Sequence, residues 1–317
     1  MKMTKSSPNH TTATAGAGKT RPAPSLDGVA WATLHGSYRS AEQVPGQIAA
    51  LRSPDSRVRR DALDELDNAV IHQGTRWQVS AHVVPFLAWL VDDPATPDRG
   101  ELTALLRQVG LGPRDDADLP FDPDAAFSRF GARTLTKEQE DLVIERVYYL
   151  EEDFTEDWVD IANACTEKWD ADAYWAAAAH VDAYRRWLAD DDPEVASRAA
   201  ELLAWFSADD TTINALLAAD RHDSVRASAN LSLAHLNVPS AATIERMTSL
   251  LGHESFAVRI TAAVALAYLS GQDLPDRALE TLIDAKEREP LPDFPPGWHG
   301  RAQRGYVALA LQRLGLG

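Results

Sequence analysis

The chain has 317 residues, of which 45% are hydrophobic, and its 48 Asp and Glu against 31 Lys and Arg give a formal net charge of −17. This length can bury a core in one or two domains. The negative charge repels phosphate backbones, so nucleic acid is not an expected partner. No run of about 18 apolar residues could cross a bilayer, and no apolar core of a secretory signal follows the first residues, so we expect a cytoplasmic protein without a membrane partner.

Residues 1–25 are expected to form a disordered basic tail, because they are rich in Ser, Thr, Ala, Gly and Pro and carry Lys and Arg but no acid. Within the tail, the stretch TATAGAGKT at residues 12–20 ends like a phosphate-binding loop. Ala13 stands where that loop needs its first glycine, no apolar strand precedes it, and two prolines follow it. The sequence therefore predicts no nucleotide site here.

Four stretches further along the chain share one pattern, in which a polar turn precedes a valine and then small or apolar residues recur at helical spacing. The valines, each with the alanine four residues later, are Val58 and Ala62, Val195 and Ala199, Val225 and Ala229, and Val258 and Ala262. These spacings place one stripe on one helix face, and alanine lets a neighbouring helix approach closely. We therefore expect the four alanines to be buried between helices.

A second amphipathic segment precedes each of the four, so the repeating unit is a helical hairpin. These segments span residues 44–52, 179–189, 211–219 and 242–251. Two further hairpins are expected within residues 82–110 and 276–315. Neither helix of a pair buries its stripe alone, so the sequence predicts an all-α fold, an α-solenoid of at least five stacked antiparallel helix hairpins. The alternation that indicates strands is nearly absent.

The turn followed by Val-Arg-x-x-Ala resembles the short HEAT-like repeats first recognised in phycobilisome lyases. Its arginine is present as Arg59, Arg226 and Arg259, and Ala196 replaces it in the remaining copy. The stretches WATLHGSYRSAEQVPGQIAAL and HQGTRWQVSAHVVPFLAWL also resemble an uncharacterised group of bacterial HEAT-repeat proteins. The resemblance covers most of residues 29–315 and implies a HEAT or armadillo-type superhelix. Such repeats serve as scaffolds, chaperones, lyases, toxin-immunity proteins and DNA glycosylases, so the resemblance does not fix the function.

An acidic insert at residues 115–172 separates N-terminal repeats at 26–114 from C-terminal repeats at 173–317, in one continuous solenoid. The insert holds 18 Asp and Glu against 5 Lys and Arg, a net charge of −13. Its beginning is predicted to be a Pro-rich loop, and residues 137–169 have apolar residues at helical spacing. The charge is typical of a solvated face, or of a surface that docks a basic protein partner by long-range attraction.

The residues expected to contact a partner come from this insert, from a histidine after the first repeat helix and from a loop near the C-terminus. They are Glu151, Glu152, Asp153, Glu156, Asp157, Trp158, Asp160, His72, Trp298 and His299. His72 is interpreted as ending a repeat helix, in a capping or packing role or as a ligand or general base. Trp298 lies in a Pro- and Gly-rich loop, where its ring anchors a partner or packs over the solenoid end.

No catalytic residue, cofactor or metal ligand is predicted. Zincin, nucleophile-elbow and Cys/His patterns are missing, the acids around Asp116 lack the later ligands of a calcium loop, and Cys165 is a lone thiol. The first function class is therefore a non-enzymatic interaction module or scaffold that presents an acidic surface to a basic partner, with immunity-type proteins as a subclass. The alternative is an enzyme built on the solenoid, such as a lyase, a biosynthetic modifying enzyme or a DNA glycosylase. A deep pocket with converging His, Asp and Glu would favour this alternative.

Overall fold

The structure is a computed structural model, and it describes residues 22–130, 134–146, 156–206, 209–288, 295–298 and 303–316. Most of the expected basic tail, residues 1–21, lies outside this described part. The main helices are α1 (Val44–Ala50), α2 (Ser56–Val70), α3 (Ser80–Asp92), α4 (Arg99–Leu111), α5 (Pro123–Ala126), α6 (Lys137–Glu145), α7 (Glu156–Ala178), α8 (Val181–Trp187), α9 (Pro193–Phe206), α10 (Asp210–Ala218), α11 (Asp223–Leu236), α12 (Ala241–Leu250), α13 (Phe256–Ser270), α14 (Asp276–Glu287) and α15 (Gln303–Arg313). No helix in these ranges is both long enough and apolar enough to span a membrane.

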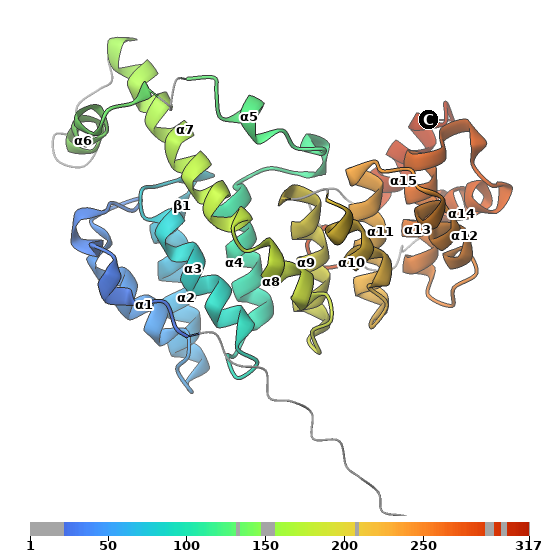
Figure 1. Cartoon of the computed structure of the whole chain (residues 1–317), viewed down its shortest axis with the longest axis horizontal. Helices are drawn as coiled ribbons and strands as arrows, with labels where there is room; N and C mark the ends of the chain where they lie inside the picture. Colours follow the sequence, from blue (N-terminus) through green and yellow to red (C-terminus); the bar gives the residue numbers. More distant parts are fainter. Residues whose placement is uncertain are drawn as a thin grey trace, which may run out of the picture.

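Consecutive helices pack as pairs, which follow one another along the molecule (Figure 1). The pairs are α1 with α2, α3 with α4, α8 with α9, α10 with α11, α12 with α13, and α14 with α15. The second helices of successive pairs also pack on one another, in the order α4, α9, α11, α13 and α15. The predicted all-α solenoid of at least five stacked helix pairs is therefore confirmed.

The aligned alanine stripe lies between these helices, as its spacing predicts. Ala199, Ala229 and Ala262 are completely buried, and Ala62 is 5% exposed. Small side chains at these positions allow the second helices to approach closely. Val58 is 43% exposed, whereas the three valines aligned with it are buried, because α2 belongs to the first pair and no earlier pair in the described chain covers it.

A short antiparallel hairpin follows α2 and consists of β1 (Ile71–His72) and β2 (Thr75–Arg76). Gln73 and Gly74 form its two-residue turn with φ values of 50° and 83°, and positive φ at both positions is what a type I′ turn requires. The interpretation of His72 as the end of a repeat helix is wrong, because α2 ends at Val70 and His72 lies in β1.

Helix α7 crosses residue 172, where the acidic insert was expected to end, and packs against α3, α4 and β2. Its buried residues Trp169, Ala173 and Ala177 recur every four residues and so lie on one face. The second half of α7 is thus part of the array's core. Its first half and α6 project beyond the helix pairs (Figure 1).

Candidate functional site

Helix α6 and residues 156–169 of α7 form the projecting part of the chain, which we call the arm. The arm has a small core of its own, made of Val143, Ile144, Cys165 and Trp169. A reciprocal capping box between Thr136 and Gln139 fixes the start of α6. Because the arm core holds one face of α6, the opposite face is free to point into solvent.

The exposed surface of the arm is mainly acidic. Among the arm residues whose side chains the structure describes, the exposed ones are Lys137, Glu138, Asp141, Leu142 and Glu145 on α6, and Val159 and Asp160 on α7. The one ammonium among them, that of Lys137, already pairs with Asp141. Two large apolar side chains lie among these acids, since Leu142 is 39% exposed and Val159 is 43% exposed.

The partner residues predicted in the insert are only partly covered by the structure. Four predicted residues lie outside the described part of the chain: Glu151, Glu152, Asp153 and His299. Glu156 and Asp157 form the first turn of α7, and their side chains also lie outside it. Asp160 is exposed on the arm. Trp158 is half-buried, and the guanidinium of Arg146 lies 4.1 Å from the centre of its ring.

Several acids of the insert are structural and do not face solvent. Glu140 is 6% exposed, and its Oε1 accepts hydrogen bonds from Trp169 Nε1 at 2.6 Å and from Gln78 Nε2 at 2.9 Å. Glu167 is also buried and accepts from the backbone N–H groups of residues 129–130, at 2.5 and 3.0 Å. Glu140 joins the arm to Gln78, just before α3, and Glu167 joins it to the loop after α5, so neither carboxylate is available to a partner.

A pocket of about 460 Å³ separates the arm from α3. Its lining includes Lys137, Glu140, Lys168 and Asp172 together with His82. The Lys168 ammonium lies 2.5 Å from Asp172, and burial lowers the pKa of His82 below its ordinary value. Among the residues that the structure describes, no group of three His, Cys, Asp or Glu could hold a metal ion.

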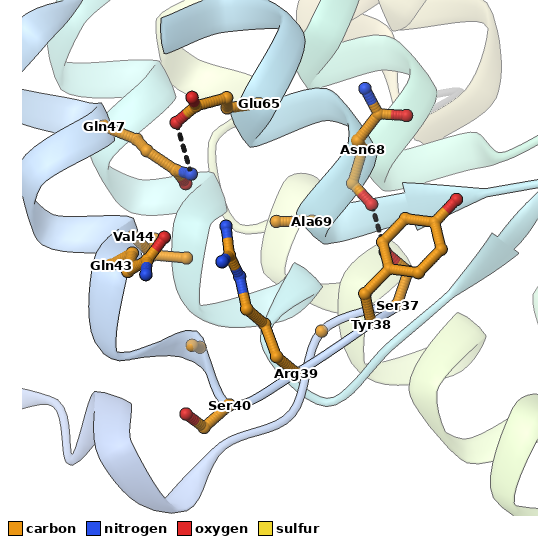
Figure 2. A pocket seen from close by; sticks show the side chains of 12 residues that line it. Ser37, Tyr38, Arg39, Ser40, Gln43, Val44, Gln47, Glu65, Asn68 and Ala69 are labelled. Carbon is orange, nitrogen blue, oxygen red and sulfur yellow. Dashed lines mark hydrogen bonds between the residues drawn. The ribbon is translucent and has the colours of Figure 1, made fainter. Parts of the chain in front are cut away.

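A second pocket, of about 360 Å³, lies between residues 36–43 and helices α1 and α2. Figure 2 shows the Arg39 side chain reaching into the space between these helices. Gln47 of α1 and Glu65 of α2 lie on its other side and share a hydrogen bond of 3.3 Å. Sequence reasoning missed these residues. Gly36 lets the loop pass close to α2, because a Cβ there would lie 2.5 Å from the Ala69 carbonyl oxygen.

His72 lies beside this second pocket and makes a packing contact. The hydroxyl of Tyr38, which is 63% exposed at the pocket rim, lies 2.9 Å from His72 Nδ1. The two rings also pack against each other, with their centres 4.8 Å apart. Of the two roles considered for His72, these contacts fit packing.

Trp298 is 2% exposed and therefore offers no ring surface to a partner. Its Nε1 donates to Ser228 Oγ at 2.8 Å, and its indole stacks on the ring of His235 with the ring centres 5.4 Å apart. Both partners belong to α11. The expectation of an exposed anchor fails because α11 supplies an acceptor and a flat ring for the indole. Trp298 therefore packs on the solenoid, on α11 rather than over its end.

The helix pairs make this chain a helical repeat protein. No family model matches the chain, and no curated protein matches it. Among solved structures it is similar to human deoxyhypusine hydroxylase in complex with glycerol, with 15% sequence identity over 86% of this chain and 96% of that chain. The TM-score of this match is 0.28.

Proposed function

We propose that this protein is a non-enzymatic interaction module whose arm presents an acidic surface to a basic protein partner. The observation that supports the proposal is the exposed face of the arm, where carboxylates surround apolar side chains. On α6, Glu138 and Glu145 are four residues before and three residues after Leu142, so all three share one helix face. Apolar anchors ringed by charge of one sign are typical of protein-binding surfaces.

The pocket behind the arm brings together His82, Glu140 and Asp172, the residue types expected of an enzyme built on the solenoid, but its acids are already engaged by other groups. Lys168 is engaged by Asp172, and Glu140 is engaged by two donors, so neither group is poised for proton transfer. We further assign the repeats to the short HEAT-like type of the phycobilisome lyases and of the uncharacterised bacterial group. An immunity protein that neutralises a basic toxin is one form of the proposed function.

Site-specific photocrosslinking of the full-length chain in its source cell tests the proposal. A photoreactive phenylalanine analogue replaces Leu142 or Val159 on the arm, and Ile283, which is 44% exposed on α14, is the control position. We expect one and the same basic protein to crosslink at both arm positions and not at Ile283. Crosslinking that is equal at all three positions would contradict a specific surface.

Charge neutralisation then tests the role of the carboxylates. The test variant is E138Q/D141N/E145Q/D160N, and the matched control neutralises four exposed acids near the other end of the chain, as D273N/D276N/E280Q/E287Q. With the crosslinked partner in hand, the arm variant should associate more slowly and with a flatter salt dependence, because steering by exposed charge is screened over roughly 8 Å at physiological salt. An equal effect of the control variant would show that only net charge matters.

A further inference from the structure

The pocket between residues 36–43 and helices α1 and α2 contains a cation and an anion that do not pair with each other. Arg39 and Glu65 are both exposed, and neither makes an ion pair among the described residues. Figure 2 shows the side chains of Arg39, Glu65 and Gln47 directed into the same space between the two helices. Opposite charges held apart across one pocket suit a ligand that carries both signs.

Gln47 provides an independent indication of a ligand. Its side chain is only 7% exposed, and its Nε2 donates to Glu65 Oε2 at 3.3 Å. Its Oε1 is buried and has no hydrogen-bond donor among the described residues. A buried carbonyl without a donor is destabilising, so this position favours a ligand that donates N–H groups.

The wall formed by α2 favours a positive group next to Glu65. Ala69 lies in the last turn of α2, one turn beyond Glu65, and the C-terminal end of a helix carries partial negative charge. An ammonium has three donors, enough to reach both the Glu65 carboxylate and the free Gln47 Oε1. On the opposite side, the planar guanidinium of Arg39 can bind a carboxylate through two parallel hydrogen bonds.

We propose that this pocket binds a small zwitterion of the amino-acid class. The carboxylate of the ligand lies on Arg39, and its ammonium lies between Glu65 and Gln47 Oε1. Ala41 and Val44 supply apolar lining for the carbons between the two charged groups. The volume of about 360 Å³ is within the range of small-molecule sites. The site uses no residue of the arm, so it is independent of the proposed protein-binding function.

Calorimetric titration of the full chain tests the proposal with defined probes. The ligands are glycine, 4-aminobutanoate and 6-aminohexanoate, which differ in the distance between the charges, with hexanoate and hexylamine as counterparts that carry one charge each. We expect at least one of the zwitterions to bind, and hexanoate and hexylamine to bind roughly tenfold more weakly than it or not at all. The proposal is overturned if no zwitterion binds, or if hexanoate or hexylamine binds as tightly as the zwitterion that binds best.

Two pairs of variants identify the residues. R39Q and E65Q should each weaken binding of the zwitterion by roughly tenfold or more, because each removes one charged contact. R60Q and D61N make the same charge changes at exposed positions of α2 outside the pocket, and they should bind like the wild type. Circular dichroism verifies that all four variants are folded. Equal losses in both pairs would assign the effect to overall charge and overturn the site.

Discussion

The guanidinium of Arg76 lies against the backbone of Gly112, just after the end of α4. A Cβ atom on Gly112 would lie 1.3 Å from Arg76 Nη1. Gly112 also has a φ of 66° and a ψ of −146°, a conformation that residues with a side chain rarely adopt. The hairpin after α2 and the end of α4 therefore meet at a point where only glycine fits.

We expect Gly112→Ala to lower the free energy of unfolding by about 3 kcal/mol or more, from backbone strain together with displacement of the buried Arg76. Urea denaturation followed by circular dichroism measures this loss. Gly46→Ala is the matched control, since Gly46 lies within α1 and a Cβ there has no neighbour within 4 Å. The control should stabilise the protein by about 0.5–1 kcal/mol. Similar midpoints for the two variants would contradict the close packing at Gly112.

The buried ion pair between Arg76 and Asp170 should show strong coupling. Arg76 is 0% exposed, and its Nε lies 2.8 Å from Asp170 Oδ1. Burial lowers the pKa of Arg76 to about 10, so the guanidinium is still charged at pH 7. Asp170→Asn should cost about 3 kcal/mol, because it leaves this charge buried without a counterion.

The double variant R76M/D170N should lose less stability than the two single losses added together, because it removes both charges. Four urea denaturation curves at pH 7 measure this coupling. D141N, which breaks the exposed pair with Lys137, is the control and should change stability little. Additive losses at Arg76 and Asp170 would show that the two charges do not depend on each other.

Cys165 should resist alkylation in the folded protein. Its side chain is fully buried in the arm core, and burial raises the pKa of its thiol to about 12, aided by the nearby negative charge of Glu140. The thiolate that reacts with iodoacetamide is therefore scarce up to pH 9. Mass spectrometry should show slow labelling in buffer and rapid labelling in urea. Rapid labelling without urea would mean that the arm core opens readily.

The same pKa shift gives a direction for stability against pH. The folded state holds the Cys165 proton more tightly than the unfolded state, whose thiol pKa is near 9.0. The stability from this group is therefore fully present below pH 9 and is lost as the pH rises towards 12. Cys165→Ala should remove this part of the pH dependence, which denaturation curves at pH 8 and pH 10 can measure. An unchanged pH dependence in the variant would contradict the shift.

Trp298 should contribute strongly to stability. Trp298→Ala removes a buried indole and its hydrogen bond to Ser228, which should cost about 3–5 kcal/mol. Trp298→Phe keeps a ring for stacking on His235 but loses the donor, so we expect a smaller loss of about 1–2 kcal/mol. Trp175→Ala, at a tryptophan that is 51% exposed, is the control for truncating a ring. A loss for Trp298→Ala no larger than this control would contradict the packing of the segment.

The helix pairs could be predicted because their signal is local. A stripe such as Val195, Ala199 and Leu203 repeats at helical spacing within one segment, and its burial follows once neighbouring segments carry the same stripe. The turn residues before the valines are local in the same way. The small hairpin after α2 escaped prediction because Gln-Gly is a weaker turn signal than Asn-Gly or Asp-Gly.

Which acids of the acidic insert are exposed and which are buried could not be predicted from its composition. Glu138 and Glu140 are two residues apart, yet the first is exposed and the second is buried by donors from distant parts of the chain. The candidate pocket has the same limit, because Arg39, Gln47 and Glu65 meet only through the packing of a loop against two helices. Contacts of this kind depend on the tertiary fold, which a periodic sequence pattern does not specify.

The segment at residues 295–298 should change the order in which the helix pairs unfold. In a repeat array whose units touch only their neighbours, the ends can fray one unit at a time. Here the carbonyl of Pro296 accepts from Ser197 of α9, and Trp298 donates to Ser228 of α11, although the segment belongs to the last pair, α14 with α15. These hydrogen bonds therefore connect the last pair to the pair α10 with α11 and to the pair α8 with α9. Unfolding from the C-terminal end must break these hydrogen bonds first, so the four C-terminal helix pairs should unfold together in one cooperative transition.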